Sequence, residues 1–406
     1  MEIQKRYTLS SAAIFVLFIV SMNHWIGWCD RAKYIYAIAG LFLWYAYKKE
    51  RVKLLMSIAK LGPCIVAYLG YMIYEIGWRG EFLSSAPYTN FFIFLFPLIM
   101  VICIKPDDKK IILNNITAWF GVLMKIALVF YLISLFIQLP NLGIIEFSKI
   151  HRSTYSPCYN YFFLTIPTEN LFEADHSFLR FQGPFIESGH LGMMCAFLLF
   201  ANKFDFSNNS NIIILVTLLF TLSLAGYMLA VIGYTLVLYN NNKIKTGTII
   251  VSLLIILLFY LFGIYYNGGD NFINESILSR LQYDEDKGFS GNNRTGVYVL
   301  TMFSNMFDNL KTALFGYDAL TLKMMEDEFG TGFVWFSVHH GIIGVIAVLW
   351  FYFMVVNRAY DKQYAWLFLL FVFAVFFQRN YPFWFSWMIC FDYGIQINDC
   401  SKRITN

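Results

Sequence analysis

The sequence predicts an all-α, polytopic integral membrane protein, and two observations lead to this fold class. The first is composition: 58% of the 406 residues are hydrophobic, 20% are aromatic and only 14% are charged, and the mean hydropathy is +0.57. The second is a succession of apolar runs of about 15 to 25 residues, the length that a helix needs to cross about 30 Å of hydrocarbon. We therefore expect about twelve transmembrane helices.

The apolar runs form three groups, separated by two long polar segments. We expect amino-terminal helices in residues 1–138, central helices in 187–266, and carboxy-terminal helices with a tail in 330–406. Residues 139–186 and 267–329 are the two intervening loops, and long loops on a rigid scaffold are where binding and catalytic residues concentrate. The predicted spans are 9–27, 34–47, 54–77, 88–104, 112–138, 187–202, 211–225, 227–240, 247–266, 330–356, 363–378 and 383–397.

The distribution of lysine and arginine predicts the orientation. These residues are densest in short segments on one side of the predicted spans, for example Lys5-Arg6 and residues 48–53, and are more widely spaced in the two long loops on the other side. Cytoplasmic loops carry the excess of positive charge in membrane proteins. We therefore expect both termini in the cytoplasm and two large extracytoplasmic loops.

Several function classes are disfavoured by the sequence. The net charge of +4 comes with no basic groove or arm, so we expect no nucleic-acid partner. No nucleotide-binding motif and no internal repeat is present, which argues against an ATP-driven machine. The seven cysteines show neither a CxxC pair nor a Cys/His spacing typical of metal sites, so we predict no metal and no cofactor.

Residues 180–192 place an Arg, a Glu and a His at the start of the sixth predicted span. An ionisable side chain at helix-centre depth costs about 2.5 to 3.5 kcal/mol, so such residues usually mark a site. We select Arg180 and Glu187 as catalytic candidates and His190 as a substrate-binding candidate, while the glycines of this segment permit close approach of a ligand or a neighbouring helix. The alternative is structural, with Glu187 capping the helix and pairing with Arg180.

The second loop carries two further arginines, Arg280 and Arg294, before an amphipathic segment at 297–310 and the triplet Phe315-Gly316-Tyr317. Guanidinium groups keep their charge and bind phosphate in a bidentate manner, so both arginines are candidates to converge with Arg180 on one diphosphate. We assign Arg294 to catalysis, and Arg280 and Tyr317 to substrate binding. The alternative is that either arginine is a solvated loop residue or pairs with the acidic run 284–286.

Two adjacent histidines, His339 and His340, lie in the tenth predicted span. An imidazole accepts a proton near neutral pH, so either is a candidate general base. We assign His340 to catalysis and His339 to substrate binding, with packing and one satisfied hydrogen bond as the alternative for each. Gly341 and Gly344 are predicted to allow close helix packing.

Together these segments resemble the O-antigen and capsular polysaccharide polymerases (Wzy type), within the O-antigen ligase and polymerase superfamily. The family pattern Arg-x-x-Gly-x-Phe-x-Glu-Pro-Gly-x-x-Gly is similar to residues 180–192, with Ser188 in place of the proline. The pattern of Ser-Arg, Ser-x-x-x-Arg, a short helix and Phe-Gly-x-Gly is similar to residues 279–318, where Tyr317-Asp318 replaces the final glycine. A late His-Gly-x-x-Gly is similar to residues 340–344.

The resemblance implies a glycosyltransferase with the multi-helix, GT-C-like arrangement, in the bacterial cytoplasmic (inner) membrane. Its donor and acceptor would both be oligosaccharide units on undecaprenyl diphosphate, with membrane lipids and a chain-length regulator protein as further partners. Arg180 and Arg294 would neutralise the diphosphate leaving group without a metal, which is electrostatic stabilisation of developing charge. Glu187 or His340 would orient or deprotonate the acceptor hydroxyl.

Three other functions compete with polymerisation. An O-antigen ligase uses the same donor but passes the finished glycan to lipid A core. A flippase or other transporter for lipid-linked oligosaccharides would have charged residues along its spans and inverted repeats, which are not apparent in the sequence. A membrane acyltransferase would take its donor from inside, whereas the charged residues here gather in the predicted outer loops.

Overall fold

The structure is a computed structural model, and it is described for part of the chain. The longer described segments are residues 7–28, 31–52, 96–146, 157–168, 180–241, 260–271, 297–318, 332–377 and 384–396. Shorter described pieces are residues 257, 274, 278, 283–284, 288–289, 321–322, 379 and 382.

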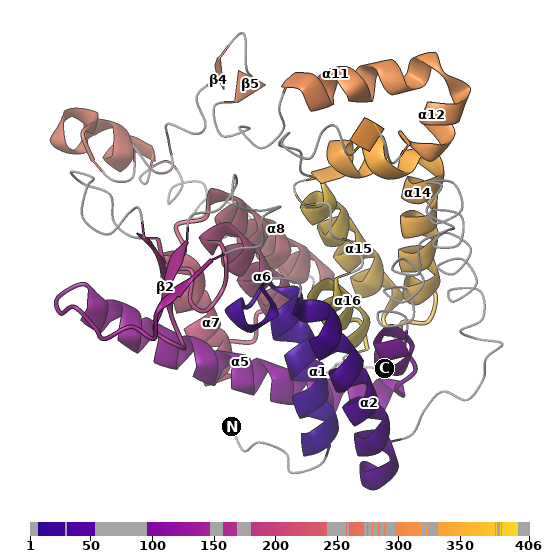
Figure 1. Cartoon of the computed structure of the whole chain (residues 1–406), viewed down its shortest axis with the longest axis horizontal. Coiled ribbons are helices and arrows are strands. Elements are labelled where there is room, and N and C mark those ends of the chain that lie inside the picture. Colours follow the sequence, from indigo (N-terminus) through magenta and orange to yellow (C-terminus); the bar gives the residue numbers. More distant parts are fainter. Residues whose placement is uncertain are drawn as a thin grey trace.

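The described residues are mostly helical, as the sequence predicts, with two small sheets in addition (Figure 1). The helices are α1 (Thr8–Ser21), α2 (Ala32–Glu50), α5 (Pro106–Ser134), α6 (Ser188–Ala201), α7 (Asn209–Phe220), α8 (Leu224–Asn240), α11 (Val297–Asn305), α12 (Leu310–Phe315), α14 (Gly332–Val356), α15 (Lys362–Phe376) and α16 (Phe385–Gly394), with 3-10 turns η1 (Trp25–Gly27), η5 (Tyr266–Gly269) and η7 (Met306–Asp308). The strands are β1 (Ile144–Ile145), β2 (Cys158–Asn160), β3 (Thr165–Pro167), β4 (Tyr283–Asp284) and β5 (Gly288–Phe289).

Helix ends follow local chemistry. Pro106 is the first residue of α5, where a missing N–H costs no hydrogen bond, and Asp107 and Asp108 in the first turn suit the positive end of the helix dipole. Lys48 and Lys49 occupy the last turn of α2, where the dipole favours positive charge. These signals define helix ends that also match the edges of the apolar runs.

Each predicted span that lies within the described residues coincides with a helix. The span at 54–77, residues 88–95 of the span at 88–104, and most of 247–266 lie outside the described residues. By length and composition, two described helices, α5 and α14, are apolar and long enough to cross a membrane, and the remaining apolar helices are shorter.

The helices alternate in direction, so the bundle has two ends with different polar contacts. At one end the start of α1 meets the end of α2, where the amides of Leu9 and Ser10 donate to the Glu50 carboxylate at 2.7 and 2.9 Å. The buried pair of Lys109, at the start of α5, with Asp392, at the end of α16, lies at this end too. We call it the Lys109 end.

The opposite end collects the other helix termini. There the amide of Ser386, at the start of α16, donates to the Ser21 hydroxyl at the end of α1 (2.9 Å). The start of α6 also lies there, where Glu187 pairs with Arg379, just beyond the end of α15. We call it the Glu187 end, and every described candidate from the sequence belongs to elements at this end.

The core is centred on α6, whose residues are all buried. A helix that is apolar on every face requires partners on every face, and α7, α8 and α16 supply them. Aromatic rings of α6 and α15 also interlock, with Phe200 in contact with Phe368 and Phe371 at centroid distances of 4.6 and 4.7 Å. The helix α6 is therefore held firmly in the core along its whole length.

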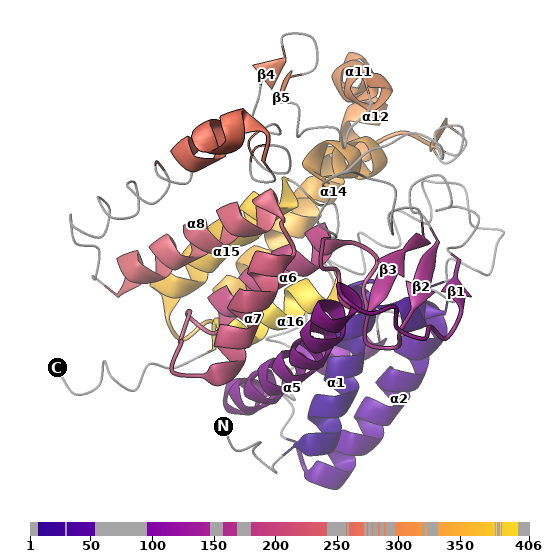
Figure 2. The same ribbon diagram turned by 90° about the vertical axis from the view of Figure 1, so that its left-hand side faces the viewer.

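A small antiparallel sheet, in the order β1-β2-β3, is formed by the predicted first loop. It lies over the connection between α1 and α2 (Figure 2), where the Trp25 indole donates to the Phe162 carbonyl at 2.8 Å. The single hydroxyl proton of Thr165 on β3 is shared between the carbonyls of Gly183 and Phe185, at 3.0 and 2.9 Å from Oγ1. The sheet thus fastens the segment that precedes α6.

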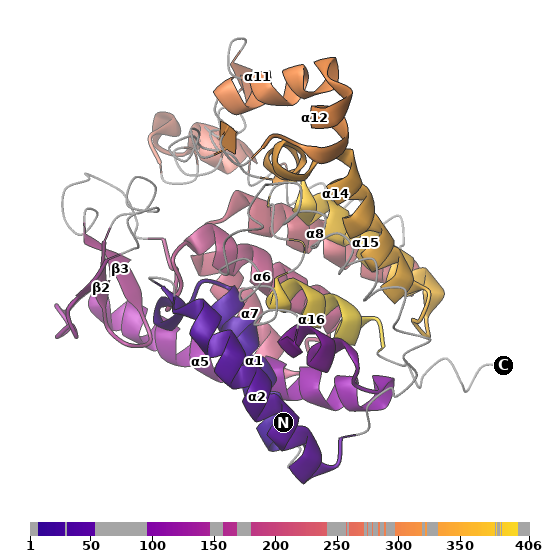
Figure 3. The same cartoon turned by 45° about the vertical axis from the view of Figure 1, so that its right-hand side comes forward.

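The predicted second loop contains the helical segment that its amphipathic pattern predicts, as α11, η7 and α12. These elements lie against the start of α14, far from α1 and α2 (Figures 1 and 3). They have a small apolar cluster of their own, which contains Val299, Met302, Leu322 and Val338. The elements α11, η7 and α12 therefore form a packed unit at the Glu187 end.

Candidate functional site

The turn before α6 is set by its sequence. Gly183 adopts a left-handed conformation (φ +57°), which glycine accepts without strain. Glu187 then takes extended geometry as the N-cap residue, and α6 begins at Ser188. Ser188 stands where the resembling family has proline, and at the first helical position both residues are compatible with a helix start.

Glu187 is the centre of a polar cluster at this turn. Its side chain makes no capping hydrogen bond with α6. One carboxylate oxygen, Oε1, lies 2.8 Å from Nη2 of Arg379, and the other, Oε2, lies 3.6 Å from Nε2 of His190. The Glu187 side chain is 23% exposed, whereas Arg379 and His190 are 5% and 1% exposed. The carboxylate is thus paired with a guanidinium, lies near a buried imidazole and is partly exposed to solvent.

Arg379 was not among the candidates from the sequence. It is separated from Glu187 by 192 positions and follows α15. Its backbone amide donates to the Val375 carbonyl of α15 at 3.0 Å. The sequence places it at the same predicted side as Glu187, in a short polar run between two apolar spans. That signal locates the residue at the correct end but does not identify its partner.

Arg180 lies beside the end of α7. Its Nε and Nη2 donate to the carbonyls of Thr221 and Leu222 at 3.2 and 3.1 Å. Carbonyls at a helix carboxyl end lack intrahelical partners and carry partial negative charge, so a guanidinium there is favourable. The ion-pair partner of Glu187 is therefore Arg379, and the structural alternative of a pair with Arg180 is not the arrangement found.

Close helix approach brings these elements together, as the glycines of residues 180–192 predict. A Cβ on Gly192 would lie 2.7 Å from Cβ of Ser223 and 2.8 Å from Oγ1 of Thr221. A Cβ on Gly226 of α8 would lie 2.9 Å from the carbonyl carbon of Gly192. Only glycine at both positions lets the α7–α8 turn sit against α6, which places the carbonyls held by Arg180 near the Glu187 turn.

The two later motifs of the resemblance contact one another. Gly341 has φ +62° and breaks α14, and a Cβ there would lie 2.4 Å from the backbone of Leu314. Gly316 has φ +78°, and a Cβ there would lie 2.6 Å from the backbone of His339. The Tyr317 amide donates to the Val338 carbonyl at 2.9 Å. Gly341 thus serves close packing, as predicted, but at a helix break and against α12.

The side chains around this break have partners within the protein. Nδ1 of His339 lies 2.9 Å from the Trp335 carbonyl, and since a carbonyl can only accept, Nδ1 carries the proton and Nε2 of the neutral ring is the basic atom. The His340 ring packs on Phe336 at 4.4 Å. The Tyr317 hydroxyl donates to the Met302 carbonyl at 3.0 Å. This gives Tyr317 a structural contact in addition to its predicted role.

Aromatic packing links the His339–Gly341 break with the Glu187 cluster. Phe336, one turn before His340, contacts Phe376 at the end of α15 with ring centroids 5.1 Å apart. Arg379 lies three residues beyond Phe376. Both groups of candidates are therefore supported by the same end of α15.

Arg280 and Arg294 lie outside the described residues. Within the described segments, no group of three or more His, Cys, Asp or Glu side chains could hold a metal ion. Comparisons of the chain with protein-family models, with curated proteins and with solved structures give no match.

Proposed function

We propose that this protein is a bacterial polysaccharide polymerase that spans the cytoplasmic membrane many times, with both termini in the cytoplasm. Its reaction joins undecaprenyl-diphosphate-linked oligosaccharide repeat units into O-antigen or capsular polysaccharide at the outer face of that membrane. The observation that carries the proposal is the Glu187 carboxylate, paired with Arg379 and 3.6 Å from His190 at the bundle end where Arg180 also lies.

The proposed reaction is glycosyl transfer. The bond between the anomeric carbon of the donor glycan and the diphosphate oxygen breaks, and polyprenyl diphosphate leaves with the electron pair. A hydroxyl oxygen of the acceptor unit forms the new glycosidic bond to that carbon, and its proton passes to the Glu187 carboxylate as general base. His340 is the second candidate for this role.

Arginines supply the charge for the leaving group. A diphosphate gains negative charge as the bond breaks, and preorganised guanidinium groups stabilise that charge in the transition state. Arg180 and Arg294 are assigned this role, with Arg280 and His339 binding substrate. Arg379 has a different task, because its guanidinium is already engaged by Glu187 and is itself buried. Its ion pair fixes the carboxylate in place, so that Glu187 is a base of defined position.

The proposal is tested by deleting the gene and separating the surface polysaccharide on a gel. Complementation uses the wild type, Arg180→Ala, Arg294→Ala and Glu187→Gln, each checked for membrane expression. Arg31→Ala is the matched control, since Arg31 is an exposed arginine at the start of α2 and at the same bundle end.

A polymerase deletion leaves the core with a single repeat unit, and we expect only the wild type and the control to restore the ladder. If no repeat unit reaches the core in the deletion strain, the ligase or flippase function replaces the polymerase. A normal ladder from both Arg180→Ala and Arg294→Ala would refute the role assigned to these arginines.

A further inference from the structure

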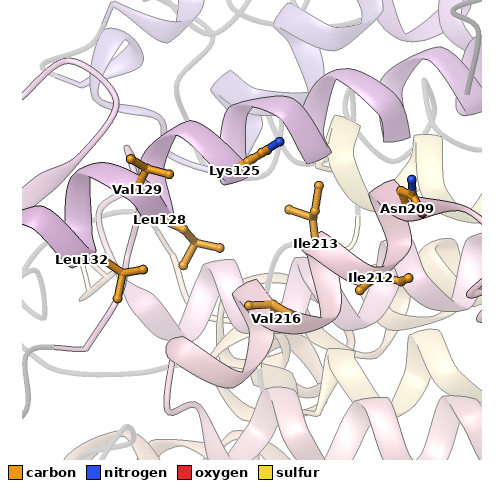
Figure 4. A pocket seen from close by; sticks show the side chains of 8 residues that line it. All are labelled: Lys125, Leu128, Val129, Leu132, Asn209, Ile212, Ile213 and Val216. Atoms are coloured by element: carbon orange, nitrogen blue, oxygen red, sulfur yellow. The ribbon is translucent and has the colours of Figure 1, made fainter.

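Apolar side chains remain exposed beyond the end of α5. Lys125 is the last charged residue of this helix, and Figure 4 shows Val129 and Leu132 following it along α5. Phe136, just beyond the helix, is 86% exposed. Between Lys125 and Glu146 the sequence contains no charged residue. An exposed part of the chain therefore carries no charge over several helical turns and the loop that follows them.

The exposed apolar surface continues from the end of α5 onto the small sheet. Leu142 and Ile144 are 70% and 56% exposed, and Ile144 lies on β1, the edge strand of the sheet (Figure 2). A contiguous apolar surface of this kind marks a contact with a membrane or a partner. We call residues 135–144 the post-helix segment.

Backbone groups of the post-helix segment are paired within the protein. The Leu142 amide donates to the Asn160 carbonyl at 2.7 Å, and the Asn160 amide donates to the Gly143 carbonyl at 3.0 Å. The Gly143 amide donates to Oδ1 of Asn141 at 3.0 Å. A backbone group near lipid is costly unless it has a hydrogen-bond partner. These bonds let the segment turn its apolar side chains toward lipid.

The rise of α5 gives the depth of the post-helix segment. Lys125 lies at the midpoint of the predicted span 112–138, and Leu135 lies about 15 Å further along the helix axis at the rise of an α-helix. Half of the hydrocarbon thickness is also about 15 Å, so a helix along the bilayer normal ends at the outer hydrocarbon boundary. An edge strand such as β1 leaves backbone groups unpaired, which excludes the hydrocarbon itself but suits the headgroup region.

We propose that the post-helix segment lies in the headgroup region of the outer leaflet, with Phe136, Leu142 and Ile144 inserted toward the acyl chains. The proposal rests on the membrane placement proposed above. Continuity with the apolar surface of α5 favours lipid over a glycan, because a glycan site requires polar side chains. The predicted first loop, residues 139–186, then begins within the membrane interface.

The segment is connected to the candidate site through the sheet. Strand β1 pairs with β2, and β2 pairs with β3. On β3 the Thr165 amide donates to the Gly183 carbonyl at 2.8 Å, and the Thr165 hydroxyl is shared between the carbonyls of Gly183 and Phe185. A segment held in the outer leaflet therefore restrains the turn that carries Glu187 relative to the bilayer, in which the lipid-linked donor is proposed to arrive.

The experiment places single cysteines in the full-length protein, reconstituted in lipid nanodiscs so that both faces of the bilayer are open to water. Phe136→Cys and Ile144→Cys test the segment. Glu146→Cys is the matched exposed site two residues beyond Ile144, and Val122→Cys is a site on α5 within the predicted span, where Val122 is 54% exposed. Each cysteine carries a bimane fluorophore, and labelled wild type gives the contribution of the native cysteines.

Quenching is measured with iodide in water and with phosphatidylcholine that carries a nitroxide near the top of one acyl chain. An interfacial segment lies about 5 to 10 Å into the boundary between headgroups and acyl chains. We therefore expect the ratio of lipid to iodide quenching to be about threefold higher, or more, for Phe136→Cys and Ile144→Cys than for Glu146→Cys. Ratios equal to that of Glu146→Cys would overturn the proposal.

Two further outcomes would also overturn it. Iodide quenching at Phe136 and Ile144 that matches the Glu146 site and is removed by purified surface polysaccharide would assign the surface to a glycan. A Val122 label quenched by iodide as strongly as the Glu146 label would refute the membrane placement together with this proposal. Because polymer formation is not measured, failure of the proposed reaction alone would leave these ratios unchanged.

Discussion

The ion pair between Glu187 and Arg379 predicts that removing the carboxylate and removing the guanidinium lower the free energy of unfolding by different amounts. Removing one partner of a buried ion pair costs about 3 to 5 kcal/mol, because the other charge remains without compensation. Arg379 is 5% exposed and its guanidinium cannot release a proton, so Glu187→Gln leaves a buried cation. The Glu187 side chain is 23% exposed and can take up a proton, so Arg379→Gln should cost only about 1 to 3 kcal/mol.

The double variant distinguishes this explanation from a general loss of packing. In Glu187→Gln with Arg379→Gln neither charge remains, so the double variant should be more stable than Glu187→Gln alone. Thermal unfolding in one detergent at one scan rate gives the ranking, which suffices because a large membrane protein unfolds irreversibly. If the losses of the two single variants simply add in the double variant, the side chains are not coupled and the assignment of Arg379 is wrong.

Three further predictions concern glycines and a tyrosine. Gly316→Ala should lower the free energy of unfolding by about 3 kcal/mol or more, because an added Cβ would meet the α14 backbone at 2.6 Å and the residue has a left-handed conformation. Gly143→Ala is the comparison, with φ +118° but open surroundings, and should lower it by about 1 to 2 kcal/mol. Thermal unfolding of the two variants gives the measurement. Gly192→Ala should lower the free energy of unfolding by about 1 to 3 kcal/mol, because the added Cβ pushes α6 away from the α7–α8 turn. A stability equal to that of the wild type would contradict the close approach. Tyr317→Phe should lower the free energy of unfolding by about 0.5 to 1.5 kcal/mol and keep the polysaccharide ladder, because the Tyr317 hydroxyl donates to a backbone carbonyl. A lost ladder at full expression would show that the hydroxyl acts on substrate.

Helix positions were largely predictable because apolar length and polar boundaries are local properties of the chain. The runs at 112–138 and 330–356 correspond to α5 and α14 within a few residues. The break of α14 at Gly341 was not predictable, since a Gly-x-x-Gly pattern fits a straight, closely packed helix equally well. The break depends on contact with Leu314, which is distant in the sequence.

The partners within the candidate site were less predictable than its location. For residues 180–192, a pair between Arg180 and Glu187 is the structural alternative to their catalytic roles. The left-handed turn at Gly183 redirects the chain, and Arg180 reaches the end of α7 while Glu187 meets Arg379. Side-chain pairing across 192 positions depends on helix packing, which periodicity within one segment does not encode.

The break at Gly341 has a consequence for local stability. Val338, before the break, packs with Val299 and Met302 of α11, whereas Phe336, on the same side of the break, belongs to the main core. Units with small separate cores open at lower free energy than the global unfolding transition. Backbone amides of α11 should therefore exchange with deuterium well before those of α6. In the proposed polymerase, α11 would then move around a bulky glycan while the bundle, with Phe336 of α14 in its core, stays folded.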